Sequence, residues 1–311
     1  YGGMLRQKIA ALRTPDAQTL ELTLSAPYAS FLMDLILPVR SSEPGSPTLL
    51  GSGPYKLQAQ DVNKITLARN PAYGGTPAGT ERVVFTVVQD ETTRFLKFRK
   101  GDVHLGVNVL PLDKLAQFDE APLTRDYALL EAPGLSYQYL GFNLRDPVLG
   151  KVKVRQALAH AIDVDGLIRF RQFGHATRAV GLFPQRSPWA APGLQPPAHD
   201  PALAQRLLDE AGYPLRDGQR FALTYKTSTD RSAVTQARII AQQLKQVGIA
   251  VTVRSYEWGV FYDDIQNGNF QLFSLRWIGV SDPDFLFELF HGSRTPPEGR
   301  NRGGYADPTL D

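Results

Sequence analysis

Two carboxylates close together in the sequence, Asp282 and Asp284, flank Pro283. A pair of acids at this spacing could serve as general acid and base in a hydrolase, or could bind a cation. Asp-Pro is also a common way to open a turn, so a purely structural role in a turn is the alternative. The residue types alone leave these alternatives open.

Other arrangements of catalytic residues find little support in the sequence. Ser136 lies in P-G-L-S-Y-Q, which lacks the second glycine of a nucleophile elbow. The five histidines are scattered, without an H-E-x-x-H pair, and there is no cysteine. No G-x-G-x-x-G follows a predicted strand. The sequence therefore predicts a protein without catalytic residues, without a protein-built metal site and without a bound cofactor.

Aromatic side chains offer a different kind of chemistry, which is contact with a bound solute. Tyr137 and Tyr139 alternate along a predicted strand and so lie on one of its faces. Trp277 ends a second apolar strand, just before the polar turn GVSDPD. Aromatic residues in strands are often core residues, but an interface between two domains is a favoured place for a pocket.

The elements that would position these aromatics meet in residues 135–163. The alternation in 136–143 predicts a strand, and Asp146-Pro147 with Gly150 predicts a turn. From Val152 the apolar residues follow a helical period up to Ile162. We interpret this stretch as a crossover, in which a strand leaves one body of the protein and enters a helix of another.

A strand-helix-strand unit is predicted on each side of this crossover. The first consists of strand 82–88, a helix 91–100 capped by Asp90 and ended by Gly101, and strand 103–109. The second consists of strand 221–226, helix 232–247 and strand 249–253. Short strands are also predicted at 127–131 and 270–277. The predicted fold class is α/β, with the two strands of each unit parallel.

Composition sets wider limits. The 311 residues are long enough for about two domains. A net charge of +3 is too balanced to indicate nucleic acid as a partner. No apolar run approaches the ~20 residues that a membrane helix needs.

Eight segments follow one another along the chain in a recognisable order. They are GSGPYKL, NPAYGG, VQDETTRFLKFRKGDV, YLGFN, VRQALAHAID, LLDEAGYP, AQQLKQVGIAVTV and RWIGVSDPDF. In this order they resemble the extracellular solute-binding proteins of family 5, which serve ABC importers of dipeptides, oligopeptides and nickel. The resemblance covers nearly the whole chain and implies a two-lobe periplasmic-binding-protein fold (type II) with a two-strand hinge.

The resemblance also implies boundaries and a setting. Residues 1–138 would form lobe I, 139–277 lobe II, and 278–311 the return to lobe I. Family members are longer, so we expect this chain to be an internal segment lacking both ends. The implied location is the periplasm, or the cell surface as a lipoprotein, with a lipid anchor outside this chain.

In peptide-binding members of the family, an aspartate three residues after the tryptophan pairs with the ammonium of the peptide. Here that position is Val280, so the anchor is not matched, and Asp282 is the substitute that we consider. The resemblance and the alternation together predict a ligand site in the cleft between the lobes. Its candidate residues are Trp277, Asp282, Tyr137, Tyr139, Asn143, Gly279 and Ile278.

The function predicted is therefore that of a monomeric receptor that passes a small peptide or similar solute to the permease subunits of an ABC importer. One alternative is a hydrolase using Asp282 and Asp284. Another is a degenerate binding module without a transport role.

Overall fold

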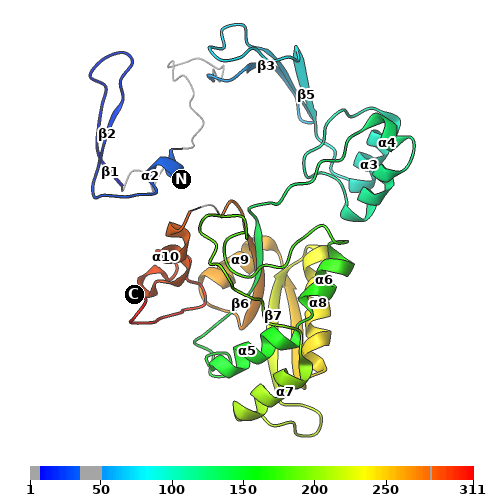
Figure 1. Ribbon diagram of the computed structural model, residues 1–311, viewed down its shortest axis with the longest axis vertical. Coiled ribbons are helices and arrows are strands. Elements are labelled where there is room, and N and C mark those ends of the chain that lie inside the picture. Colours follow the sequence, from blue (N-terminus) through cyan, green and yellow to red (C-terminus); the bar gives the residue numbers. More distant parts are fainter. Residues whose placement is uncertain (1–7, 36–50, 281) are drawn as a thin grey trace. The chain divides into compact units, whose positions relative to one another are not determined.

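The computed structural model describes residues 8–35, 51–280 and 282–311. It divides into two compact units, Tyr1–Ala128 and Leu129–Asp311, each described here by itself (Figure 1). Residues 278–311 belong to the second unit, whereas the sequence assigned them to the first lobe. That lobe assignment, with its boundary at residue 138, stays a prediction.

The first unit contains two antiparallel sheets and a small helical cluster. Strands β1 and β2 form a hairpin, and β3, β4 and β5 form a three-stranded sheet in that order. The elements are β1 (Ile9–Arg13), β2 (Glu21–Leu24), α2 (Phe31–Asp34), β3 (Tyr55–Gln60), β4 (Lys64–Arg69), β5 (Arg82–Thr86), α3 (Glu91–Lys100), the 3-10 helix η1 (Leu112–Asp119) and α4 (Leu123–Asp126).

Helix α3 has the ends that the sequence predicted. The Asp90 carboxylate accepts a hydrogen bond from the Thr93 N–H at 2.7 Å, and Gly101 ends the helix with a φ of 81°. Its buried Phe95 and Phe98 pack with Phe118 in edge-to-face geometry.

The predicted strand 103–109 is wrong, and so is the strand-helix-strand unit of the first lobe. Carbonyl oxygens that a ladder would use accept side-chain donors instead. The Tyr127 hydroxyl donates to Val103 O at 2.6 Å, and Arg94 Nε donates to Val109 O at 2.8 Å. Asn108 also has a positive φ of 54°, which interrupts an extended chain. Residues 127–131, also predicted as a strand, have no ladder either.

The second unit is built on one four-stranded sheet with the order β6-β9-β7-β8. Strands β9, β7 and β8 run parallel, and β6 pairs antiparallel with β9. The elements are β6 (Tyr137–Phe142), α5 (Val152–Ala161), α6 (Val164–Arg171), α7 (Pro201–Glu210), β7 (Phe221–Ser228), α8 (Arg231–Lys245), β8 (Ile249–Tyr256), α9 (Trp258–Gln266), β9 (Leu272–Trp277), α10 (Asp284–Phe290) and the 3-10 helix η2 (Gly292–Arg294).

The strand-helix-strand unit β7-α8-β8 is confirmed. Phe221 pairs with Ile249 at the start of a parallel ladder that continues to Tyr256. Asp230 caps α8 through the Ala233 N–H at 2.8 Å, and Gly248 turns the chain with a φ of 85°. Strands β5 and β7 lie in different sheets, as the two-body prediction requires.

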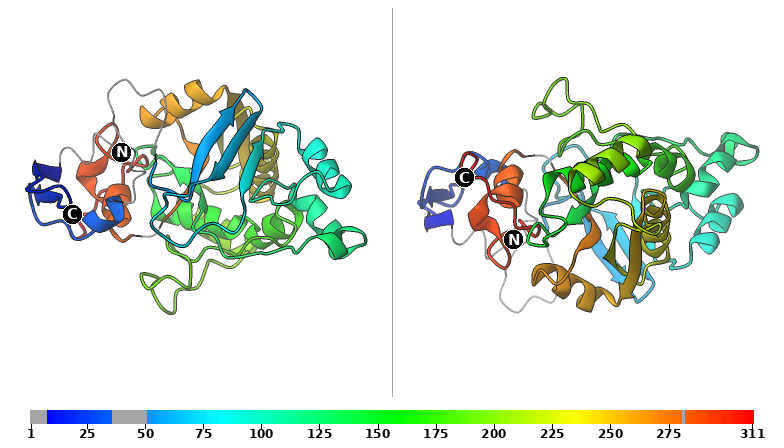
Figure 2. Two further views of the ribbon diagram at one scale, coloured as in Figure 1. Left: turned by 90° about the horizontal axis from the view of Figure 1, so that it is seen from above. Right: turned by 90° about the horizontal axis from the view of Figure 1, so that it is seen from below.

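The two faces of this sheet carry separate cores (Figures 1 and 2). Helices α5, α7 and α8 supply the larger core, which includes Leu272 of β9. Helix α9 covers the opposite face, where Phe273 packs against Phe261 and Ile265. Leu272 and Phe273 are adjacent in the strand, so they point to opposite faces. The same alternation puts Trp277 on the face covered by α9.

Candidate functional site

The two predicted crossover strands, β6 and β9, are neighbours, and their pairing brings the predicted aromatics together. Tyr137 lies opposite Trp277 in the antiparallel register, and Tyr139 lies opposite Leu275. Side chains of opposed residues share a face of the sheet. The alternation read from the sequence therefore places Tyr137, Tyr139 and Trp277 on one face.

These three rings form a continuous stack, called the aromatic stack below. The ring centroids of Tyr137 and Tyr139 are 6.3 Å apart with planes 11° from parallel. Those of Tyr139 and Trp277 are 5.6 Å apart with planes 5° from parallel. Gly141 follows on the same face, where a Cβ would lie 2.3 Å from the Phe273 ring. A side chain at Gly141 would thus displace the ring on which Tyr139 rests edge to face.

Helix α10 extends the aromatic stack with a residue that the sequence analysis missed. The Phe285 ring meets the Trp277 ring edge to face, with centroids 5.2 Å apart. The sequence predicted only a turn at GVSDPD. The run 284–290 is only seven residues long and apolar at most positions, so it shows no clear helical period.

Arg302 is the second functional side chain that the sequence analysis missed. It is only 6% exposed, yet its guanidinium donates to the Tyr139 hydroxyl at 2.8 Å and to the Tyr262 hydroxyl at 3.1 Å. Its Nε donates to Gln266 Oε1 at 3.2 Å. The guanidinium carbon lies 4.4 Å from the centroid of the Trp277 ring, a cation–π distance.

This environment changes the pKa of the tyrosines in the aromatic stack. Burial raises the pKa of Tyr139 to about 12, although the nearby Arg302 charge and hydrogen bond act in the opposite direction. Burial also raises the pKa of Tyr137. Both hydroxyls therefore remain neutral donors and acceptors at physiological pH.

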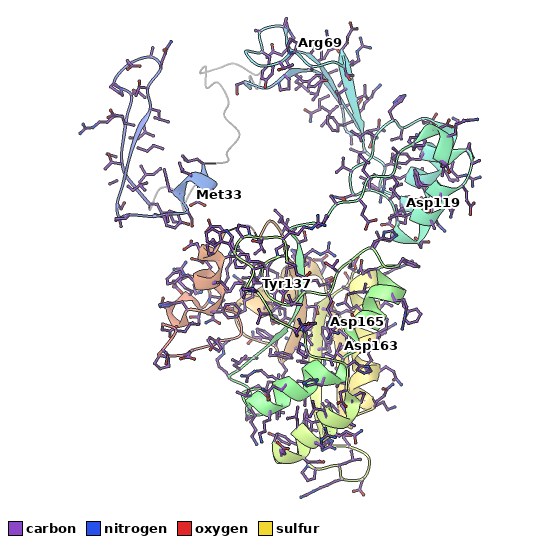
Figure 3. All side chains as sticks on the ribbon, viewed as in Figure 1. Met33, Arg69, Asp119, Tyr137, Asp163 and Asp165 are labelled. Atoms are coloured by element: carbon purple, nitrogen blue, oxygen red, sulfur yellow. The ribbon has the colours of Figure 1, made fainter. Side chains whose placement is uncertain are left out.

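A cavity of about 290 Å³ lies next to the aromatic stack in the same unit. Its walls are residues 133–137, which lead into β6, and the loop 177–186. Tyr137 belongs to both the cavity and the aromatic stack. Figure 3 labels Tyr137 on β6 and Asp165 on α6, whose carboxylate pairs with Arg178 of the cavity wall at 2.7 Å.

The other predicted site residues lie apart from the stacked rings. Asn143 donates to the carbonyl oxygens of Gly268 (3.2 Å) and Phe270 (2.9 Å), which is a structural role at the far end of β6. Ile278 is 80% exposed. Gly279 takes a left-handed φ of 71°, and it leads into Val280, which is 1% exposed and bonded through its N–H to Leu135 O at 3.1 Å.

Asp282 adopts the turn geometry that its neighbour Pro283 suggested. Its carboxylate accepts the Asp284 N–H at 2.9 Å, at the beginning of α10. This contact supports the turn interpretation of the acid pair.

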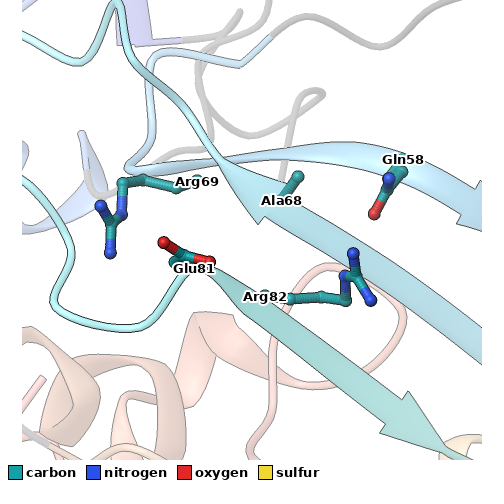
Figure 4. Close-up of a pocket in the computed structure, with 5 residues that line it drawn as sticks. All are labelled: Gln58, Ala68, Arg69, Glu81 and Arg82. Carbon is teal, nitrogen blue, oxygen red and sulfur yellow. The ribbon is translucent and has the colours of Figure 1, made fainter.

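The first unit has a more open hollow of about 500 Å³ on its three-stranded sheet. Figure 4 shows the five residues that line it, which are Gln58, Ala68, Arg69, Glu81 and Arg82. The Arg69 guanidinium is held by a hydrogen bond to Gly79 O at 3.0 Å. The sequence analysis had selected none of these residues.

The described part of the chain contains neither a cluster of metal ligands nor a helix that could span a membrane. Within residues 8–35, 51–280 and 282–311, no three His, Cys, Asp or Glu residues are grouped so as to hold a metal ion. In those same ranges, no helix combines the length and the apolar character needed to span a bilayer.

Comparison with known proteins gives a consistent picture. The chain is 28% identical to the dipeptide-binding protein of Escherichia coli over 97% of its length, which is 59% of that relative. It is 29% identical to the nickel-binding periplasmic protein of the same organism over 90% of its length, or 58% of the relative. The chain thus spans about three-fifths of the length of these curated relatives.

Solved structures agree on the fold. NikA from Brucella suis in complex with Fe(III)-EDTA has a TM-score of 0.82 at 26% identity, with 97% of this chain and 64% of that one covered. The periplasmic binding protein DppA from Helicobacter pylori in complex with the peptide STSA has a TM-score of 0.75 at 26% identity, with 99% and 62% covered. The predicted periplasmic-binding-protein fold class is confirmed.

The family itself follows from a match over most of the chain. Residues 1–296 match the family described as "Bacterial extracellular solute-binding proteins, family 5 Middle". The matched relatives are binding proteins, which supports the prediction of a non-enzymatic protein and counts against the hydrolase alternative. The chain belongs to family 5 of the bacterial extracellular solute-binding proteins.

Proposed function

We propose that this protein is the substrate-binding receptor of an ABC importer, and that it captures a small peptide or a similar small solute. The observation that carries the proposal is the aromatic stack, which lies on the paired strands β6 and β9 and borders a cavity through Tyr137. Membership of family 5 supports it, as do relatives named for dipeptide and nickel binding.

The aromatic stack suits a ligand with a flat or extended backbone. Indole and phenol rings provide a large rigid surface, and the indole N–H of Trp277 adds a hydrogen-bond donor. The adjacent cavity, at about 290 Å³, is near the lower end of the volumes usual for small-molecule sites. A dipeptide or a compound of similar size therefore fits the proposal better than a long peptide.

The remaining site predictions form part of this proposal. Gly279 and Ile278 would present backbone groups to the ligand beside Trp277, and Asp282 would pair with a ligand ammonium. Asn143 would contribute indirectly, because its amide fixes the end of β6. Capture between two lobes that close around the solute is the mode of binding that we propose.

The proposal extends to partners and location. The receptor would act as a monomer, would deliver its solute to the permease subunits of the importer, and would work in the periplasm or as a lipoprotein at the cell surface. It would need neither a cofactor nor a nucleic acid.

Thermal unfolding of the purified chain in the presence of small solutes tests the proposal. The panel comprises dipeptides and tripeptides of varied charge, and Ni²⁺ with and without free histidine. A true ligand at 100 times its Kd should stabilise the folded state by about 2.7 kcal/mol, because it binds only that state. Hits are then measured by calorimetry. If every member of the panel leaves the midpoint unchanged, the proposed solute class is wrong.

A further inference from the structure

The charges around the aromatic stack are unusual because they are positive and lack acidic partners. Arg302 is almost wholly buried, and its hydrogen-bond partners are all neutral: Tyr139, Tyr262 and Gln266. Among the described residues, no carboxylate lies within ion-pair distance of its guanidinium. A buried charge is normally paired, so this one leaves an uncompensated positive field at Trp277.

A second guanidinium adds to this field from the solvent side. The exposed Arg300 lies 5.6 Å from the centroid of the Trp277 ring and 5.7 Å from that of Phe285. It has no ion pair with any acid in the described ranges. Arg294, which precedes Arg300 in the same C-terminal segment, is by contrast paired with the Glu288 carboxylate at 2.6 Å.

The acids in this part of the second unit have contacts other than Arg300 and Arg302. Asp282 caps the backbone N–H of Asp284, and neither acid forms a described ion pair with Arg300 or Arg302. Asp264 pairs with Lys226 at 2.6 Å on the same face of the sheet. Val280, three residues after Trp277, is a buried apolar residue and adds no charge.

The cavity beside Tyr137 has the same charge character. Arg178 and Arg186 are the charged residues that line it, and none of its described lining residues is acidic. Asp165 neutralises Arg178, whereas the exposed Arg186 has no such partner among the described residues. The carboxylate of Glu131, two residues before this wall begins, contacts the His175 ring, with 2.9 Å between Oε2 and Nδ1.

Resting on the proposed function, we propose that this site selects small solutes that carry carboxylate groups and a net negative charge. Arg300 contacts the ligand carboxylate beside Trp277. Arg302 is a positioning residue, which fixes Tyr139 and Trp277 and supplies a positive charge 4.4 Å from the centroid of the Trp277 ring. A guanidinium is suited to this task because its planar fork matches a carboxylate and keeps its charge at any physiological pH.

The first experiment measures the positive electrostatic field at Trp277 and does not require the natural solute. A variant with Trp189→Phe and Trp258→Phe retains Trp277 as its single tryptophan. Its fluorescence is quenched with iodide and, separately, with caesium at equal ionic strength. We expect iodide to quench severalfold more efficiently than caesium, and Arg300→Gln to reduce that ratio at least twofold. Arg238→Gln, an exposed arginine on α8, is the matched control and should leave the ratio unchanged.

The second experiment measures selectivity with the isosteric dipeptides Ala-Glu and Ala-Gln. Calorimetry should show Ala-Glu binding at least tenfold more tightly, with a preference that declines between 20 and 500 mM NaCl because salt screens the interaction. Arg300→Gln should reduce the preference to within twofold, and Arg300→Lys should retain part of it. Arg302→Gln removes the buried charge. If that variant does not fold, Arg302→Lys takes its place, because lysine keeps the positive charge but loses the planar guanidinium.

The outcomes separate this inference from the proposed function. Equal affinity for both dipeptides would overturn the selectivity for anions and leave the receptor function standing. An iodide-to-caesium quenching ratio that is unchanged in Arg300→Gln would also overturn the selectivity for anions. If neither dipeptide binds, but the iodide preference still depends on Arg300, peptide capture fails and the anion site is supported.

Discussion

Arg302 and Tyr139 are 163 positions apart in the chain and are joined by a hydrogen bond of 2.8 Å between guanidinium and phenol. This contact connects the last segment of the chain to β6. The arginine also lies over Trp277, so one side chain fixes two of the three rings of the aromatic stack. The relationship explains how a strand pair that carries few polar side chains can hold a rigid aromatic surface.

Replacing Trp277 with Ala should weaken ligand binding by about 2 kcal/mol or more, as expected for an aromatic anchor. The cost in folding free energy should stay below the ~3–5 kcal/mol of a core tryptophan, because Trp277 is only partly buried. Calorimetry with the best solute from the panel and urea unfolding measure the two effects. Trp189→Ala, 52% exposed, is the control. Unchanged affinity in Trp277→Ala would remove this residue from the site.

Asp282→Asn addresses the ligand ammonium separately from the ligand carboxylate. If Asp282 pairs with a free ammonium, the variant should bind Ala-Glu at least tenfold more weakly, since a close charge pair is lost. N-acetyl-Ala-Glu, which has no ammonium, should bind the variant and the parent equally well. The fold should survive, because asparagine can still accept the Asp284 N–H. A variant that binds both compounds normally would exclude Asp282 as the ammonium partner.

The stability of the second unit should fall between pH 10 and pH 12. Burial raises the pKa of Tyr139 to about 12, above the value of about 10 for a tyrosine in an unfolded chain. Below pH 10 both states hold the phenolic proton, and the stabilisation is complete. As the pH rises further, the unfolded chain loses this proton first, so the folded state loses up to about 3 kcal/mol.

Urea unfolding at pH 9 and pH 11 provides the measurement. Tyr139→Phe should lose less stability between these two pH values than the parent does. The variant has one tyrosine fewer whose pKa is raised in the folded state. Tyr225, whose pKa burial also raises to about 12, provides a parallel case through Tyr225→Phe. An identical loss in parent and Tyr139→Phe would show that Tyr139 does not titrate in this way.

The ion pair between Lys226 and Asp264 joins β7 to α9 and is largely shielded from solvent. Lys226→Met should destabilise the protein by about 3 kcal/mol, because it leaves a carboxylate in a poorly hydrated place. Adding Asp264→Leu should recover most of that loss. Lys153→Met, which removes the exposed pair with Glu210, should cost less than about 1 kcal/mol. Thermal and urea unfolding of the three variants and the parent test this order.

The sequence by itself determined those parts of the protein whose signals are local. The two ends of the helix 91–100 follow from the capping side chain of Asp90 and from Gly101, both close by in the chain. The alternation of Tyr137 and Tyr139 fixed their common face, because successive residues of a strand point to opposite sides. Ordered segments of several residues were enough to identify the family.

The tertiary structure alone decided which distant residues meet. Residues 103–109 have the composition of a strand, but the side chains of Tyr127 and Arg94 donate to the carbonyl oxygens of Val103 and Val109, and none of the described strands pairs with this segment. Arg302 could not be predicted as part of the site, because no local pattern encodes contact with a ring 163 positions earlier. Whether a charged side chain is buried, and which groups it then contacts, depends on its surroundings after folding. Only the packed structure contains this information.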